Sequence, residues 1–460
     1  MDKYCVIKFL EEIMKKLSRS EFLQVSIMLF GLFFGAGNLI FPPLLGNQAG
    51  SATYLALLAF SLTAVLFPVM GAIVVGKTDG LSKLANRVGP VFSAVFTTAI
   101  YLSIGPGLGI PRAGSVPFEM AIAPYIPESF NINLARLLYT LVFFSLAMFI
   151  CLKPNKLVKR IGKYLTPTLL LMITLMFLRV IFMDKSVAAP TGDYLEGPFT
   201  KGFLAGYDTM DAVAALNFGF VIAMAIRRFG IEDKKEITKY EVKAGLLAGS
   251  VLFLVYAMLA TIGRIGSAKF PGLENGAQVL TESVKVIFGD FGLIFIAFMF
   301  TLACLTTCVG LINSGSEYFE NLFNHKLSYR KWVVIWSLFS FLMANFGLNK
   351  LLAFSVPLLQ VIYPVALVLI IMGISHDYLG YYKASYLAAA VVSVTLPLLQ
   401  VLNETFKVNL GFVTSTLKSL PLYDEGLAWV LPTFVAVAFV SLLLKVLEND
   451  RETSKAVQKY

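Results

Sequence analysis

Apolar stretches of about 20 residues recur along the chain, and short polar segments separate them. A helix of that length crosses the roughly 30 Å hydrocarbon core of a bilayer. The pattern therefore predicts an all-α polytopic membrane protein with about twelve transmembrane helices. We place the spans at residues 22–48, 53–76, 91–120, 134–152, 162–183, 203–227, 243–263, 287–313, 331–346, 351–373, 384–403 and 427–447.

The composition supports this class and excludes an ordinary soluble protein. Of the 460 residues, 57% are hydrophobic and 14% are charged, and the mean hydropathy is +0.77. Soluble domains carry roughly 25% charged residues. Because no linker or low-complexity stretch divides the chain, we expect a single transmembrane domain over residues 21–447. It would hold spans 1–5 in residues 22–183, spans 6–10 in 203–373 and spans 11–12 in 384–447.

The net charge of +10 comes from basic residues that collect in particular loops. Clusters lie at residues 153–163 and 227–243, whereas residues 47–53, on the opposite side, contain no Lys or Arg. This asymmetry is the positive-inside pattern, so we expect a multi-pass protein of the cell (inner) membrane with both termini in the cytoplasm. The charge thus reflects orientation in the lipid bilayer, and no nucleic-acid partner is expected. Residues 1–20 predict a cytoplasmic interfacial segment, and 448–460 a cytoplasmic tail.

The first span is interrupted near its middle. Residues 35–38 read Gly-Ala-Gly-Asn, and Pro42 and Pro43 follow in the same apolar run. An unpaired backbone group in hydrocarbon costs several kcal/mol, so a spanning helix breaks only where protein, water or a ligand pairs the freed groups. We expect a second interruption in span six at residues 217–219, Asn-Phe-Gly. Two broken helices five spans apart cross the membrane in opposite directions, which indicates an inverted-repeat transporter.

The first break is a candidate site for a carboxylate. Gly35, Ala36 and Gly37 let the backbone approach a ligand, and the orphan N–H groups of the restarting half-helix favour an anion. Asn38 can cap that half-helix with its side-chain oxygen. The two prolines are tolerated best near a first turn, which predicts that the helix restarts close to them. The alternative is that the small residues only permit tight packing of helices.

Two neighbouring hydroxyls in span eight are candidate ligands for a cation. Thr306 and Thr307 follow the small residue Ala303 by one helical turn. Together with the carbonyls of Gly31 and Phe34, which the first break would partly free, they could form a neutral all-oxygen site for a hard monovalent cation. The alternative is that each hydroxyl bonds back to a carbonyl three or four residues earlier.

Ionisable residues inside the spans are candidates for a functional or structural role, because a charge at mid-bilayer costs roughly 2.5–3.5 kcal/mol on insertion scales. Asp208 and Asp211 share a helical face in span six, where Asp211 could face a cavity and Asp208 could lie at its mouth. Arg112 and Glu119, seven residues apart in span three, could pair as a gate or as a structural ion pair. Since no Lys lies in the middle of a span, sodium is the first candidate for a coupling ion and a proton on Asp211 the second.

Other classes of function are less well supported. The four Cys and two His show no metal-ligand spacing, so no cofactor is expected beyond a coupling ion. An intramembrane enzyme would need a nucleophile and base, a metal cluster or a carboxylate dyad at depth, and Asp208 with Asp211 is the only candidate dyad. A channel would be expected to carry a repeated filter motif, which the sequence lacks.

Several motifs resemble one known family. They are Gly-Leu-Phe-Phe-Gly-Ala-Gly-Asn-Leu-Ile-Phe-Pro-Pro at residues 31–43, Ile-Gly-Pro at 104–106 with Ile-Pro-Arg at 110–112 and Phe-Glu at 118–119, Thr-Met-Asp-Ala at 209–212, and Leu-Ala-Cys-Leu-Thr-Thr at 302–307. The chain resembles the bacterial branched-chain amino acid:cation symporters over nearly its whole length. The resemblance implies a member of the amino acid–polyamine–cation superfamily with the leucine-transporter-type fold. In that fold, a five-plus-five inverted repeat with discontinuous helices 1 and 6 is followed by two further helices.

The resemblance also assigns residues to two sites. It implies a sodium site at the carbonyls of Gly31, Phe34 and Ala303 and the hydroxyls of Thr306 and Thr307. It implies that a substrate carboxylate meets Gly35, Ala36 and Gly37, and that Val213, Ala215 and Phe218 line the amine and side chain. We expect Asn38, Asp211, Asn217 and Gly219 to complete the substrate site. Val213 stands where related sodium-coupled proteins carry a threonine, which argues against a second sodium ion.

The sequence therefore leads to one expected function and its rivals. We expect a symporter that imports leucine, isoleucine or valine with sodium by alternating access, and we expect no enzymatic activity. The first alternative is a proton-coupled transporter of branched-chain or other small neutral amino acids. An intramembrane enzyme and a channel are the more distant alternatives.

Overall fold

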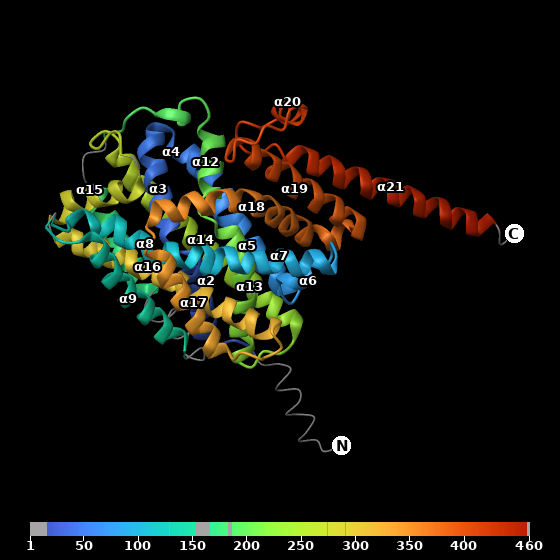
Figure 1. Ribbon diagram of the computed structural model, residues 1–460, viewed down its shortest axis with the longest axis horizontal. Coiled ribbons are helices and arrows are strands. Elements are labelled where there is room, and N and C mark those ends of the chain that lie inside the picture. Colours follow the sequence, from blue (N-terminus) through green and yellow to red (C-terminus); the bar gives the residue numbers. More distant parts are fainter. Residues whose placement is uncertain are drawn as a thin grey trace, which may run out of the picture. The chain divides into compact units, whose positions relative to one another are not determined.

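The computed structural model describes residues 16–127, 129–152, 166–182, 186–273, 275–289 and 291–457. Throughout these residues the regular secondary structure is helical, without strands (Figure 1). The all-α class predicted from the apolar pattern is confirmed. The predicted interfacial segment falls outside the described residues except for its last five positions, and the tail's last three residues also fall outside them.

Each of the twelve predicted spans contains helix in the described residues. The first six correspond to α2 (Arg19–Phe33) with α3 (Ala36–Ala49), α4 (Thr53–Ser61) with α5 (Phe67–Lys77), α7 (Pro90–Leu102) with α8 (Gly109–Ala121), α9 (Ile132–Cys151), α11 (Thr166–Val180), and α12 (Pro198–Tyr207) with α13 (Asp211–Arg228). The last six correspond to α14 (Lys234–Gly266), α16 (Phe291–Leu322), α17 (Tyr329–Ala344), α18 (Leu348–Leu379), α19 (Lys383–Glu404) and α21 (Val430–Val457). By length and hydropathy, eight helical stretches of the described chain could cross a membrane, and the bent pair α12–α13 could form one more span. The total of twelve spans stays a prediction.

Shorter helices fall between these segments. They are α6 (Leu81–Ala85), α15 (Gly276–Phe288) and α20 (Phe412–Lys418). Helix α2 begins at a capping box in which the Ser18 hydroxyl accepts from the Glu21 backbone and the Glu21 carboxylate accepts from the Ser18 backbone. This reciprocal pairing satisfies two orphan donors and fixes where the first helix starts.

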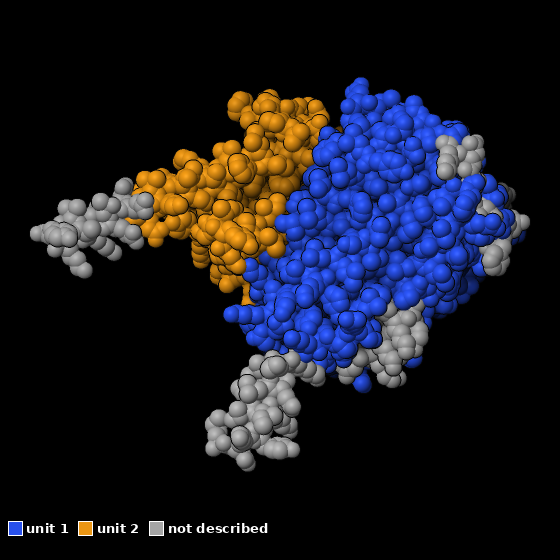
Figure 2. All heavy atoms as spheres, turned by 180° about the vertical axis from the view of Figure 1, so that it is seen from behind, with its two compact units in different colours: residues 1–80, 101–352 blue, residues 81–100, 353–460 orange. Residues whose placement is uncertain are grey.

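The chain forms two compact units, drawn in different colours in Figure 2. The first unit comprises residues 1–80 and 101–352, and the second comprises residues 81–100 and 353–460. In the second unit, Leu417, Tyr423 and Ala428 form a small buried cluster. Both interruptions predicted from the sequence belong to the first unit, so the candidate site is built there.

Helices α3 and α14 of the first unit lie side by side in close backbone contact (Figure 1). A Cβ atom added to Gly263 would stand 1.9 Å from the Pro43 carbonyl oxygen, and one added to Gly46 would stand 1.9 Å from the Ala260 carbonyl oxygen. Only glycine fits at such distances. This is the small-residue packing that membrane helices use to bring backbones together.

Pro42 and Pro43 lie in the interior of α3, six and seven residues after Ala36. The expectation that they mark the first turn of the restarting helix is therefore wrong. A proline inside a helix removes the hydrogen bond to the carbonyl four residues earlier. The helix continues through both prolines because neighbouring helices surround it, and α14 covers the Pro43 carbonyl.

Replacing Gly263 by alanine tests the α3–α14 contact. The new methyl group must displace the Pro43 carbonyl, and overpacking of this kind costs about 1–3 kcal/mol. We expect Gly263→Ala to lower the thermal unfolding temperature of the detergent-purified protein. Gly89→Ala is the matched control, because nothing lies within 4 Å of its added Cβ. Equal unfolding temperatures for the two variants would contradict the packing described here.

Candidate functional site

The first interruption separates α2 from α3 at Phe34 and Gly35. Gly35 has φ −109° and ψ −161°, which is extended backbone, and Phe34 has φ −79° and ψ 86°. The structure therefore places this break at the N-terminal edge of the predicted interval 35–38. The Gly35 N–H donates to the Phe33 carbonyl and to Asn38 Oδ1, at 2.9 Å each. The Gly31 carbonyl, four residues before Gly35, thus loses its usual helical partner.

Asn38 caps the second half-helix as expected, but from inside the helix. Its Oδ1 accepts from the N-cap residue Gly35, three positions earlier. Its other amide atom, Nδ2, donates to an Asp211 carboxylate oxygen and contacts the Tyr256 hydroxyl oxygen. One side chain therefore satisfies the first break and also reaches two other helices.

The second interruption lies between α12 and α13, which meet at a bend of 43°. Residues 208–210 separate the two helices, and Met210 adopts the left-handed conformation with φ 67°. The Thr209 hydroxyl donates to the Gly206 carbonyl at 2.8 Å, which satisfies an acceptor at the end of α12. The break thus comes immediately before Asp211, the first residue of α13.

The predicted break at residues 217–219 is wrong. Asn217, Phe218 and Gly219 lie inside α13 and are buried. A Cβ on Gly219 would stand 2.6 Å from the Ala72 carbonyl oxygen of α5, so this glycine serves close packing between helices. The Phe218 ring lies 5.9 Å from the Phe33 ring, at the end of α2. Among the predicted substrate residues, Gly219 faces α5 and Phe218 reaches the end of the first half-helix.

A buried cluster of Asn38, Asp211 and Tyr256 joins both interruptions to α14. Their exposed fractions are 1%, 4% and 0%. The Tyr256 hydroxyl donates to Asp211 Oδ2 at 3.1 Å, and Asn38 Nδ2 donates to the same oxygen. Hydrogen bonds to an ionised acceptor are stronger than neutral ones and offset part of the cost of burying a carboxylate. Since a carboxylate offers about four lone-pair sites, Asp211 retains acceptor capacity for an ammonium group, a metal cation or a proton.

The residues predicted to bind sodium come from α2 and α16. The Thr307 hydroxyl donates to the Leu32 carbonyl at 3.1 Å, and a Cβ on Gly35 would stand 2.9 Å from Thr307 Oγ1. Thr307 is therefore in contact with the first break. The Thr306 hydroxyl donates to the Ala303 carbonyl at 2.8 Å, which is the back-bonding considered as the alternative. Of these α16 groups, the Thr307 hydroxyl lies next to the end of α2, where Gly31 and Phe34 are located.

The other predicted substrate residues occupy the two helices that restart at the breaks. Ala36 and Gly37 form the first turn of α3, and Val213 and Ala215 lie fully buried in the first turns of α13. Asn217 Oδ1 is buried and has no hydrogen-bond partner in the described residues. The lining near the breaks is therefore small and apolar, with Asp211 as its acidic group.

Three residues near the breaks were not assigned to the site by sequence reasoning. Arg112 of α8 donates from Nη1 to the Met210 sulfur at 3.2 Å, and its Nη2 would lie 3.2 Å from a Cβ on Gly37. Tyr256 is a single tyrosine in an apolar span and carries no local signal. Thr209 could have been recognised as the residue that ends α12, because threonine bonds readily to nearby backbone groups.

The predicted pairing of Arg112 with Glu119 is wrong. Arg136 of α9 takes Glu119, with Nη2 at 3.0 Å and Nε at 3.1 Å from Oε1. Both nitrogens therefore donate to one carboxylate oxygen in a charge-assisted contact. Arg112 therefore faces the two breaks instead of its own helix.

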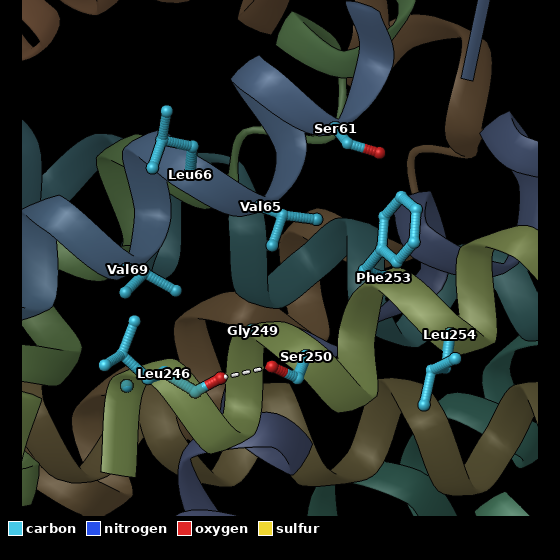
Figure 3. Close-up of a pocket in the computed structure, with 10 residues that line it drawn as sticks. Ser61, Val65, Leu66, Val69, Leu246, Gly249, Ser250, Phe253 and Leu254 are labelled. Carbon is cyan, nitrogen blue, oxygen red and sulfur yellow. Dashed lines mark hydrogen bonds between the residues drawn. The ribbon is translucent and has the colours of Figure 1, made fainter. Parts of the chain in front are cut away.

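An apolar groove lies elsewhere in the first unit, between the α4–α5 segment and α14 (Figure 3). Its volume is about 470 Å³, and Val65, Val69, Gly249 and Phe253 are among its lining residues. The Ser250 hydroxyl donates a hydrogen bond to the Leu246 carbonyl at 2.8 Å, so it is already paired within its own helix. The described residues that line the groove carry no charge, so they offer nothing to a zwitterion and the groove is not the candidate site.

The fold is that of solved transporters with a leucine-transporter-type architecture. A manganese transporter of Eremococcus coleocola superposes with a TM-score of 0.56 at 14% identity, covering 92% of this chain and 97% of the other. MhsT, solved in complex with L-phenylalanine, gives a TM-score of 0.53 at 16% identity and covers 92% and 98%. At these identities the likeness establishes the fold alone. The class that the fold defines is thus the helical leucine-transporter-type architecture.

The family model described as branched-chain amino acid transport protein matches residues 18–447. The chain belongs to this family, and the resemblance seen in its motifs is confirmed. It is 38% identical over 431 residues to the branched-chain amino acid permease BrnQ of Bacillus subtilis, covering 91% of this chain and 95% of the relative. It is 36% identical over 441 residues to the branched-chain amino acid transport system 2 carrier protein of Pseudomonas aeruginosa, covering 95% and 99%. Membership in a transporter family also agrees with the expectation that the protein is not an enzyme.

A double-mutant cycle tests the buried cluster. Tyr256→Phe removes a donor from a buried carboxylate, which costs about 1–3 kcal/mol of unfolding free energy. In an Asp211→Asn background the same change should cost less, with a coupling free energy of about 0.5–3 kcal/mol. Thermal unfolding of the purified variants measures both values.

Tyr139→Phe serves as the control for this cycle. The Tyr139 hydroxyl bonds to Thr301 Oγ1 at 2.8 Å, so a half-buried tyrosine loses a neutral partner outside the cluster. We expect its effect to add to that of Asp211→Asn. Additive behaviour of Tyr256→Phe would show that the carboxylate does not depend on this hydroxyl.

Proposed function

We propose that this protein, a branched-chain amino acid transporter, imports leucine, isoleucine and valine together with sodium by alternating access. The substrate would bind between the two breaks, with its carboxylate at the first turn of α3 near Gly35, Ala36 and Gly37. Its ammonium group would meet Asp211. The small buried residues Val213 and Ala215, with Phe218 beyond them, would accept a short branched side chain. Its relatives are named as permeases and carriers of branched-chain amino acids, which supports this choice of substrate.

The proposal of sodium rests mainly on the contact between Thr307 and the first break. Thr307 Oγ1 lies 3.1 Å from the Leu32 carbonyl oxygen and next to Gly35. A cation held there by the carbonyls of Gly31, Phe34 and Ala303 and the hydroxyls of Thr306 and Thr307 would fix the interrupted backbone. An ion that organises the break would raise the affinity for the substrate that the break binds, and this reciprocal effect is the physical basis of symport.

A proton is the second candidate for the coupling ion. The observation that favours it is the burial of Asp211, which accepts from Asn38 and Tyr256 and stands at the second break. A carboxylate in that position could gain and lose a proton as the site changes its access to water. In this case Asp211 would carry the ion and Thr306 and Thr307 would serve only the helix.

The proposed orientation places both termini in the cytoplasm of a cell-membrane protein. Basic residues at the junction of α13 and α14 support this orientation. Arg227 lies 3.2 Å and Lys234 lies 2.5 Å from carboxylate oxygens of Asp79. These residues belong to the loops that carry the excess of Lys and Arg, which favours the cytoplasmic face.

Uptake into proteoliposomes distinguishes the two coupling ions. We expect an inward sodium gradient to drive accumulation of labelled leucine, and unlabelled isoleucine and valine to compete better than alanine or a nucleobase. If only an imposed proton gradient drives the accumulation of leucine, the coupling ion is a proton and the assignment of sodium is wrong. Leucine uptake that responds to neither gradient would remove symport from the proposal.

Loss of either threonine hydroxyl should weaken sodium binding. We expect Thr306→Ala and Thr307→Ala each to raise the sodium concentration for half-maximal leucine uptake by about tenfold, since a ligand to a charged group is lost. Thr174→Ala is the matched control, because this hydroxyl of α11 bonds back to the Leu170 carbonyl at 2.8 Å and lies outside the site. An unchanged sodium dependence in both variants would contradict the assigned site.

A further inference from the structure

Arg112 is a permanent positive charge next to the first break. It lies in the first turns of α8, where its backbone N–H donates to the Leu108 carbonyl at 3.0 Å. Its guanidinium reaches both restarting helices, because Nη1 contacts the Met210 sulfur and Nη2 lies against Gly37. The absence of a side chain at Gly37 is what allows this approach to the first turn of α3.

The guanidinium has donors to spare. It carries five N–H groups, and a thioether sulfur is a weak acceptor. In the described part of the chain, the Met210 sulfur is the partner that Arg112 bonds, since Glu119 is held by Arg136. Asp208 and Asp211 of the second break act on the guanidinium through charge attraction. A half-buried arginine inside a span costs free energy, so its partly unused donors point to a ligand.

The N-terminus of α3 presents positive character at the same place. The first N–H groups of a helix have no intrahelical acceptor. The Gly35 N–H is taken by Phe33 and Asn38, and the Ala36 N–H meets the Cys304 sulfur. Gly37 and Asn38 follow in the same turn, and Gly37 is the residue that Arg112 touches. Helix end and guanidinium together favour an anion of the size of a carboxylate.

We propose that Arg112 binds the α-carboxylate of the transported amino acid and sets the requirement for that group. This inference rests on the proposed function, because it needs an amino acid between the breaks. The carboxylate would accept from Arg112 and from the first turn of α3, while the ammonium group meets Asp211. The site then offers a guanidinium to the carboxylate and an acidic group, Asp211 with Asp208 nearby, to the ammonium group, and a zwitterion matches both.

Three ligands separate this role from a structural one. Leucine carries both charged groups, leucinamide lacks the carboxylate charge, and 4-methylpentanoate lacks the ammonium group. Inhibition constants against labelled leucine uptake are measured for the wild-type protein and for Arg112→Gln. We expect the constant for leucine to rise about tenfold or more, because a charge-assisted pair is lost. The constant for leucinamide should change less than about twofold, since it makes no charge pair with Arg112.

Further variants test which charged residue recognises which group of the ligand. Arg112→Lys keeps the charge without the planar fork and should restore part of the preference for leucine. Asp211→Asn should weaken leucine and leucinamide but leave 4-methylpentanoate nearly unchanged. Lys239→Gln is the control, because it removes an exposed cation of α14 that pairs with Glu236 at 2.8 Å, and it should change none of the constants.

The outcomes are separable. Equal weakening of leucine and leucinamide by Arg112→Gln, or no weakening of leucine, would overturn the assignment. If Arg112→Gln does not fold, Gly37→Ala replaces it, because its methyl group would stand 3.2 Å from Nη2 and should reduce the preference for leucine over leucinamide. A wild-type protein that does not take up leucine would reject the proposed function itself, whatever the variants do.

Discussion

The hydrogen bonds that Asp211 accepts from Asn38 and Tyr256 are the interaction on which the arrangement of the first unit depends. Each break exposes backbone groups at a depth where water is scarce, and each must be satisfied by protein. Asn38 completes the first break through Gly35 and at the same time reaches the residue that begins α13. Tyr256 ties both to α14. This cluster joins the two interrupted helices by hydrogen bonds, beside the contact between the Phe33 and Phe218 rings.

The same arrangement brings two charged side chains, Asp211 and Arg112, to the region of the two breaks. Asp211 is an acid buried between helices, and Arg112 is a cation whose guanidinium contacts Met210, the residue before Asp211. Opposite charges at short range in a medium of low polarity attract strongly, but they are also ready to exchange partners with a ligand of matching charges. The chain belongs to a family of branched-chain amino acid transport proteins, and an amino acid is a zwitterion of this kind. Binding such a ligand would explain why the charged side chains of Asp211 and Arg112 lie inside the membrane.

Local signals in the sequence were sufficient for the class and for the first break. Gly-Ala-Gly-Asn inside an apolar run marks a break because no continuous helix benefits from that composition, and the structure interrupts the helix at Phe34 and Gly35. Thr307 was identified by its spacing from Ala303, and it lies against Gly35. The break depends on residues close together in the chain, which is why the pattern located it, whereas the contact of Thr307 with Gly35 joins distant parts of the sequence.

Features that depend on distant partners were not predictable in the same way. Asn217 and Gly219 look like a break, but Gly219 packs on the Ala72 carbonyl and the helix continues. The true break uses Met210 in a left-handed conformation, which the sequence does not favour. The partner of Glu119 proved to be Arg136 of another helix, and Tyr256 gave no signal at all. Tertiary contacts decided each of these cases.

The glycine contacts between α3 and α14 have a mechanical consequence. Where Gly263 rests on the Pro43 carbonyl and Gly46 on the Ala260 carbonyl, the two helices cannot slide past one another without a steric collision. Interlocked helices of this kind travel as one rigid body, and Tyr256 travels with the second half of the first span. Beside this interlocked pair, the two breaks, at Phe34–Gly35 and at residues 208–210, are the points where the backbone of the interrupted spans is free of helical constraint.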